Sequence, residues 1–341
     1  MINMQPCFPT REEYSLTYFN FIQNINICIS EIYNTFNSRK IKSIFNNSKI
    51  VIFTNKIWHE FINEPEEELD LKILNQSSSA YAYALRVLYL HLSNHHQRPN
   101  QGIYTDDHVA VQSILLCLQS VFNDPVFLSK LDNTRRSQQK SRDSLYQYAT
   151  DLKHIYRKLM VVRVDFGYNQ FVSKTVLPQR RIEDDWERQL QYVQKNFADS
   201  FVGYAVKFEH GKDKGLHAHS VFFFDGNVVC NDAKIGRILG EYWEHLVTDD
   251  LGLHFNCNTS DHKASLLVCG LGTFTGREQA FRDGMWIIAD YLSKPDAMVR
   301  LLLPERTKIF RRGYLNYWQQ LKLTNRLAMP CTASVEFTTL S

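Results

Sequence analysis

The sequence predicts an α+β protein, with a mostly helical N-terminal region over residues 1–145 and a mixed region over residues 146–341. Three observations support this class. Apolar residues follow helical spacing in the first region, strands and helices alternate after about residue 155, and a polar, basic segment without apolar residues (133–144) separates the two patterns. A chain of 341 residues, 44% of them hydrophobic, is long and apolar enough for two packed domains.

The N-terminal region contains two clear helical patterns. Residues 77–96 begin with three serines, which favour a helix start, and continue with Leu85, Leu88 and Leu92 on one face. Residues 109–122 repeat this pattern. Segment 133–144 is the best candidate for the domain boundary, because it carries no apolar side chain to bury.

The mixed region is predicted to contain strands and intervening helices. Its predicted strands are residues 159–168, the two arms of a hairpin (201–211 and 215–226), and residues 265–272. Its predicted helices are residues 182–197, 231–247 and 277–294. This order of elements indicates an α+β sandwich with a largely antiparallel sheet.

Composition excludes little by itself. The net charge of +3 is too small to identify a nucleic-acid-binding protein. The seven cysteines form no CxxC pair, which argues against a zinc ribbon and suits a reducing compartment. The first residues lack the pattern of a signal peptide, and no apolar stretch approaches the roughly 20 residues needed to span a bilayer. We therefore expect a cytoplasmic protein without a membrane partner.

The hairpin carries the strongest chemical signal. His217 and His219 share one face of the second arm, because side chains alternate along a strand. If the turn centres on Asp213, Glu209 lies opposite His217 and Lys207 lies opposite His219. Two imidazoles and a carboxylate at this spacing can hold one ion, and the set suits Mn²⁺, Fe²⁺ or Zn²⁺ better than Mg²⁺. The alternative is that both histidines are ordinary polar residues on a solvated face.

A tyrosine follows near the end of the last predicted helix. Tyr291 and Lys294 are three residues apart and therefore neighbours on one helix face, before Pro295 discourages further helix. An ammonium group favours the phenolate form, so the pair could supply a nucleophile for phosphoryl transfer. With 17 tyrosines in the chain, a structural Tyr-x-x-Lys is the competing interpretation.

The segment from Lys294 to Arg326 is basic and aromatic. This segment contains eight basic and two acidic residues. The interleaved aromatic residues are Phe310, Tyr314, Tyr317 and Trp318. Basic groups can follow a phosphate backbone and aromatic rings can stack on unpaired bases, although a solvated basic face over a small core would have the same composition.

Together these motifs resemble a known superfamily. A His-hydrophobic-His strand followed by a Tyr-x-x-Lys helix is similar to the HUH endonucleases. The strings "LMVVRVDFGY", "KFEHGKDKGLHAHSVFFFDG", "IIADYLSKPD" and "FRRG" resemble the replication-protein family of filamentous phages (inoviruses), over about residues 155–315. Ala218, between the histidines, is smaller than the usual residue. The single tyrosine indicates one-tyrosine chemistry.

The resemblance implies both a fold and a set of roles. The fold is a five-stranded antiparallel sheet with flanking helices. The cofactor is a divalent metal, Mn²⁺ or Mg²⁺, on Glu209, His217 and His219, with Tyr291 as nucleophile and Lys294 orienting the phosphate. Arg163 and Asp165 lie in the first strand and are expected to contact DNA or to support the sheet. The residues expected to bind DNA are Arg163, Arg306, Lys308, Arg311 and Arg312.

The implied function is site-specific nicking and strand transfer on single-stranded or locally melted origin DNA, which initiates rolling-circle replication of a mobile element. Other functions stay open: a non-catalytic DNA-binding regulator with the same fold, a metal-dependent nuclease that uses water, or an enzyme that attacks a competing genome. Residues 1–145 resemble nothing identified, and could recruit host replication proteins.

Overall fold

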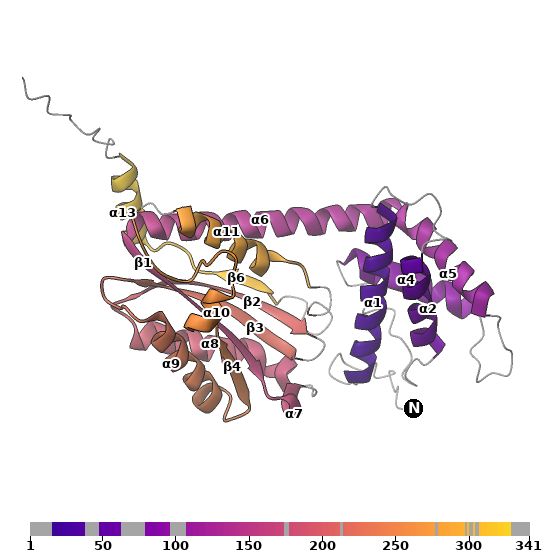
Figure 1. Ribbon diagram of the computed structural model, residues 1–341, viewed down its shortest axis with the longest axis horizontal. Helices are drawn as coiled ribbons and strands as arrows, with labels where there is room; N and C mark the ends of the chain where they lie inside the picture. Colours follow the sequence, from indigo (N-terminus) through magenta and orange to yellow (C-terminus); the bar gives the residue numbers. More distant parts are fainter. Residues whose placement is uncertain are drawn as a thin grey trace, which may run out of the picture.

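A computed structural model gives the architecture (Figure 1). The residues it describes are 16–37, 48–62, 79–95, 107–173, 177–211, 214–276, 279–296, 299, 303 and 307–328. The expected α+β class is confirmed: helices precede an antiparallel sheet that is flanked by further helices.

The N-terminal region is a cluster of helices with its own core. Its helices are α1 (Leu16–Asn37), α2 (Ser48–Ile62), α4 (Ala80–His95) and α5 (Asp107–Phe122). The predicted stripe of Leu85, Leu88 and Leu92 is at most 1% exposed and packs in this core. The core also takes in Phe127 and Leu131, which belong to the next helix.

The longest helix, α6 (Pro125–Ile155), connects the two regions (Figure 1). It begins where the Asp124 carboxylate accepts a hydrogen bond from the backbone N–H of Val126, with Pro125 in the first turn. Segment 133–144, the predicted boundary, is continuous helix in the middle of α6. The change from one region to the other therefore happens along a single helix. No single helix among the described residues is long and apolar enough to cross a membrane; α5 and α6 meet that criterion only together, as a pair bent by 64°.

The sheet has the strand order β4-β1-β3-β2-β6, and every pair in it is antiparallel. The strands are β1 (Lys158–Tyr168), β2 (Phe201–Gly211), β3 (Gly215–Asp225), β4 (Gly252–Asn256), β5 (Gly272–Thr275) and β6 (Phe310–Arg312). β5 and β4 both pair with β1 on the same side, β5 near its start and β4 near its end. They share one edge, so the sheet is five strands wide.

Helices cover both faces of the sheet (Figure 1). One face packs on α8 (Leu177–Asn196) and α9 (Asp232–Tyr242), where Phe222 of β3 stacks on Trp186 at 5.9 Å between ring centroids. The other face packs on α6 and α11 (Gln279–Ser293). The central strand β3 is buried on both sides, and burying each phenylalanine of residues 222–224 contributes about 1.5–3 kcal/mol.

The face of the sheet that packs on α6 and α11 is in close contact with both helices. The helix α6 packs closely on β2 at Gly203, where an added Cβ would collide with the Tyr148 hydroxyl and with Leu152. The predicted stripe of α11 packs here: its members Phe281, Met285, Ile288 and Leu292 are all buried. This packing fixes the end of α11 over β3, the strand that carries His217 and His219.

Two predicted elements differ in detail. Residues 265–272 are not a strand; Leu267 is fully exposed, and strand β5 begins only at Gly272, because the apolar run has no partner strand to pair with. The predicted helix 231–247 is confirmed with Asn231 as its N-cap, but its last turn, Trp243–Val247, is a π-helix. Short helices α7 (Gln170–Ser173), α10 (Ser260–Ala264) and α13 (Tyr317–Ala328) complete the fold.

Candidate metal and tyrosine site

The hairpin has the predicted register. Glu209 pairs with His217 and Lys207 with His219 across β2 and β3, and Gly211 pairs with Gly215, which centres the turn on position 213. All four side chains project from the face that packs on α6 and α11. His217 and His219 are 7% and 3% exposed, so the interpretation as solvated surface histidines is wrong.

Each histidine directs the same ring nitrogen into the cluster. His217 Nδ1 lies 2.9 Å from the Gly215 carbonyl and His219 Nδ1 lies 2.9 Å from Asp165 Oδ2. Both oxygens can only accept, so both Nδ1 atoms carry the hydrogen and both Nε2 atoms keep a lone pair. The two Nε2 atoms are 3.1 Å apart, and Glu209 Oε2 lies 3.3 Å from His219 Nε2.

This donor set fits a cation. Two lone pairs that face each other at 3.1 Å repel unless a positive charge stands between them or one is protonated. Ligand atoms on adjacent positions of one ion, with bonds of about 2.1 Å, lie about 3 Å apart. The Glu209, His217 and His219 ligand atoms all lie within 4.8 Å of one another, so the group could hold a metal ion.

Asp165 supports the cluster from the neighbouring strand. It pairs with His219 across β1 and β3, so its carboxylate can accept the Nδ1 hydrogen. The same carboxylate accepts two hydrogen bonds from Arg163, each of 3.0 Å. A carboxylate behind a histidine fixes the tautomer and raises the basicity of the nitrogen that faces a metal. Asp165 therefore has the position of an orienting partner for His219.

Tyr291 of α11 reaches the same point from above the sheet. Its hydroxyl lies 2.9 Å from His219 Nε2, although the two residues are 72 positions apart in the chain. Three cations surround its ring. The distances to the ring centroid are 4.6 Å for Arg163, 5.8 Å for Lys294 and 5.9 Å for Lys207. Burial raises the pKa of Tyr291, and Arg163 opposes this by favouring the phenolate.

The charges within the cluster shift the other groups in consistent directions. When His219 is protonated at Nε2 as well as Nδ1, with no ion bound, its hydrogen bond lowers the pKa of Glu209 far below its usual range, and the ammonium of Lys207, 2.9 Å away, adds to this. Burial would raise the pKa of Asp165, but hydrogen bonds and charges from His219 and Arg163 lower it to about 2. Burial and the nearby His219 lower the pKa of His217 to about 4. Both carboxylates are thus ionised at neutral pH, ready to balance a cation.

The residues predicted to bind DNA are scattered. Arg163 lies inside the cluster and is held by Asp165. Arg311 is on the opposite face of the sheet, where it pairs with Glu183 and Glu187 of α8 and covers the ring of Phe208 at 5.2 Å. The strand pairing requires this, because Arg311 is opposite Val206, which faces that core.

The other residues predicted to bind DNA have different surroundings. Arg312 donates a hydrogen bond of 2.8 Å to Ser144 and lies 5.0 Å from the Tyr148 ring centroid, so it ties β6 to α6. Lys308 is exposed, and Arg306 lies outside the described residues. The basic tail is therefore not one continuous DNA-binding surface: Arg311 points away from the metal cluster and Arg312 is engaged by α6.

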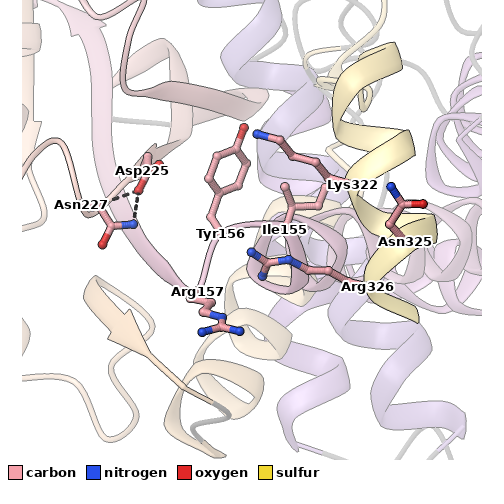
Figure 2. Close-up of a pocket in the computed structure, with 8 residues that line it drawn as sticks. All are labelled: Ile155, Tyr156, Arg157, Asp225, Asn227, Lys322, Asn325 and Arg326. Carbon is pink, nitrogen blue, oxygen red and sulfur yellow. Dashed lines mark hydrogen bonds between the residues drawn. The ribbon is translucent and has the colours of Figure 1, made fainter. Parts of the chain in front are cut away.

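Two cavities border this half of the molecule. One, of about 400 Å³, lies beside the tyrosine, between α6 and the segment that follows α11; Lys207 and Lys294 are among its lining residues. The other, of about 420 Å³, lies at the far end of α6 against α13 (Figure 2). In the second, Arg326 donates a hydrogen bond of 2.6 Å to the His154 carbonyl in the last turn of α6. Its basic lining thus complements a helix C-terminus.

Sequence reasoning did not assign Asp165 and Lys207 to the site. Lys207 was recognisable as the residue opposite His219, and it is 3% exposed with its ammonium on Glu209. Asp165 carried only the signal of sharing a strand face with Arg163. Comparisons with known proteins add no assignment, since no family model, curated protein or solved structure matches this chain.

Proposed function

We propose that the protein is a metal-dependent single-strand DNA nickase and strand-transferase that uses Tyr291 as its nucleophile. One observation carries the proposal: the Tyr291 hydroxyl lies 2.9 Å from a ligand atom of the His217, His219 and Glu209 cluster. A nucleophile and a metal that both act on one phosphate must be within such reach. The motif order that resembles the HUH endonucleases supports the same reaction.

The reaction is a transesterification. The Tyr291 oxygen forms a bond to the scissile phosphorus while the bond from phosphorus to the 3′ oxygen breaks. The phenolic proton leaves to solvent and the departing 3′ oxygen takes one up, so the products are a 5′-phosphotyrosine and a free 3′-OH. A bound divalent ion would polarise the phosphate and offset its negative charge. Reversal by the same 3′-OH, or by another, rejoins a strand.

The protein's own cations have separable roles. Arg163, over the face of the phenol ring, stabilises the negative charge that develops on the phenolic oxygen during attack. Lys294 is exposed at the edge of the site, where it can bind a phosphate oxygen. Lys207 is buried and paired with Glu209, so its role is to hold the carboxylate ligand.

The test is formation of a covalent adduct. The full chain is incubated with Mn²⁺ and a random-sequence library of single-stranded DNA labelled at the 3′ end, and the protein is then denatured. The label stays on the protein only if the fragment downstream of the cut, which carries the labelled 3′ end, is attached to it through its 5′ phosphate. We expect an adduct with the wild type, and none with Tyr291→Phe or with His217→Ala/His219→Ala.

Three outcomes would contradict the proposal. Cleavage of the library without a label on the protein would indicate a nuclease that uses water. Tight DNA binding without cleavage under Mn²⁺ or Mg²⁺ would indicate a non-catalytic regulator. A Tyr291→Phe variant that still forms the adduct would show that the assigned nucleophile is wrong.

A further inference from the structure

The inner stripe of α6 changes character where it passes the tyrosine. At the N-terminal end, Phe127 and Leu131 pack in the helical core; at the C-terminal end, Leu145 and Leu152 pack against the sheet. Asn133 lines the cavity between them, together with four residues that share one helix face: Thr134, Ser137, Gln138 and Ser141, spaced as i, i+3, i+4 and i+7. All four are small or amide side chains without charge.

These four residues line the cavity of about 400 Å³ that adjoins the site. Its opposite wall includes Leu292 at the end of α11, Lys294 just after that helix, and Phe310 at the start of β6. Tyr81, at the start of α4, closes one end. The cavity therefore lies between the N-terminal helical region and the catalytic sheet of the proposed enzyme, and its volume is within the range of about 300–1,000 Å³ that is usual for ligand sites.

The distribution of charge on α6 also separates this stripe from the rest of the helix. Arg135, Arg136 and Lys140 are exposed and line no part of the cavity. Within the part of the chain that the structure describes, the Gln138 amide has no hydrogen-bond partner, although it is only partly exposed. An amide offers both a donor and an acceptor to a ligand, which a charged side chain does not.

We propose that this cavity binds an unpaired base of the DNA strand next to the scissile phosphate, and that the Gln138 amide of α6 hydrogen-bonds its edge. Thr134 Oγ1 donates its own hydrogen to the Lys130 carbonyl at 2.9 Å and can accept a further hydrogen bond from the base. The inference rests on the proposed nickase function and extends it, because it makes the N-terminal region part of the substrate site. Amide and hydroxyl groups recognise base edges, and the aromatic rings of Tyr81 and Phe310 offer apolar surface to the flat faces of a base. Lys294, at the rim beside Tyr291, binds the adjoining phosphate.

The chain offers a matched control. Gln138 faces the cavity, while Gln139 is the same residue type one position further on and is exposed on the outer side of the helix. Binding of the random single-stranded DNA library is measured by fluorescence anisotropy with Mn²⁺, in full-length Tyr291→Phe protein so that no cut follows. The variants Gln138→Ala, Gln138→Trp, Gln139→Ala and Gln139→Trp are compared at several salt concentrations. Thermal unfolding of each variant shows that it is folded.

Gln138→Ala should weaken binding about fivefold, as expected for the loss of hydrogen bonds to one base, and should leave the salt dependence unchanged because no phosphate contact is removed. Gln138→Trp fills the cavity and should weaken binding at least tenfold. Both Gln139 variants should bind within twofold of their parent. The same ranking should appear in the yield of covalent adduct when Tyr291 is present.

The inference and the proposed function fail in different ways. If both Gln138 variants bind DNA as their parent does, or if the parent binds no DNA, the cavity is not a base site. If Gln138→Trp loses binding while wild-type protein forms no adduct, the cavity is a DNA site and the nickase reaction is wrong. A Gln138 variant that lowers both DNA binding and the yield of covalent adduct supports the base site and the nickase reaction together.

Discussion

Removing the charge of Asp165 should weaken metal binding although Asp165 is not itself a proposed ligand. Its carboxylate accepts the Nδ1 hydrogen of His219 at 2.9 Å and two hydrogen bonds from Arg163. With a pKa of about 2, Asp165 is ionised at neutral pH, so Asp165→Asn removes a full negative charge from behind the imidazole. The amide keeps one oxygen, which cannot serve both His219 and Arg163 as the carboxylate does.

The expected loss is 10–100-fold in Mn²⁺ affinity, the usual cost of removing a partner that orients a metal-binding histidine. This corresponds to about 1.4–2.7 kcal/mol of binding free energy. The His219→Ala variant should lose more, because it removes a ligand. Adding Asp165→Asn to His219→Ala should then change little, since the carboxylate acts through the imidazole.

Isothermal titration of the full chain with Mn²⁺ measures the effect. An unfolded fraction, which the loss of the partner of buried Arg163 could create, lowers the apparent stoichiometry and not the affinity of the folded molecules. Asp184→Asn, an exposed change on α8, is the control and should bind as the wild type does. An unchanged affinity in Asp165→Asn would refute the role given to this carboxylate.

Three further results are expected. Saturating Mn²⁺ at 100 times its dissociation constant should stabilise the folded protein by about 2.7 kcal/mol, seen as a higher unfolding temperature than in EDTA, and His217→Ala/His219→Ala should show no such rise. Gly284→Ala should lower the free energy of unfolding by about 1–3 kcal/mol, because the new Cβ would collide with the backbone of Gly270; Asp283→Ala, one exposed position earlier, is the control in urea unfolding. Arg311→Ala should leave adduct yield unchanged and cost at most about 1 kcal/mol of stability, since its partners are partly exposed carboxylates on the far face; a large loss of adduct would restore the DNA-binding role first expected for Arg311.

The parts of the site that were predictable are those set by local geometry. Strand alternation places His217 and His219 on one face, and a short hairpin fixes Glu209 opposite His217 whatever the rest of the fold does. The helical stripe from Phe281 to Leu292 likewise determines which side of α11 meets the sheet, and so where Tyr291 projects.

Asp165 was not predictable, because its role depends on pairing between distant strands. β1 and β3 are separated by three other elements, α7, α8 and β2, and a shift of one residue in their register would point Asp165 to the other face. The same argument explains Arg311. Its basic neighbourhood in the sequence suggested DNA, but the pairing of β6 with β2 directs it to the α8 side.

The boundary segment shows how a correct observation can have more than one structural meaning. Residues 133–144 lack apolar side chains, which is typical of a linker, yet they are helical throughout. Helical spacing explains how a segment without apolar residues can be part of a packed helix. One side of α6 is apolar at Leu131 and again at Leu145, and between them the same side is polar where it lines the cavity. Along the cavity the side chains on this side of α6 are uncharged, while Arg135, Arg136 and Lys140 are exposed away from it and Arg142, one position beyond, packs on Trp286 of α11. A helix that merely joined two domains would need no uncharged stretch at this place, so the arrangement supports the proposal that the middle turns of α6 line a substrate site.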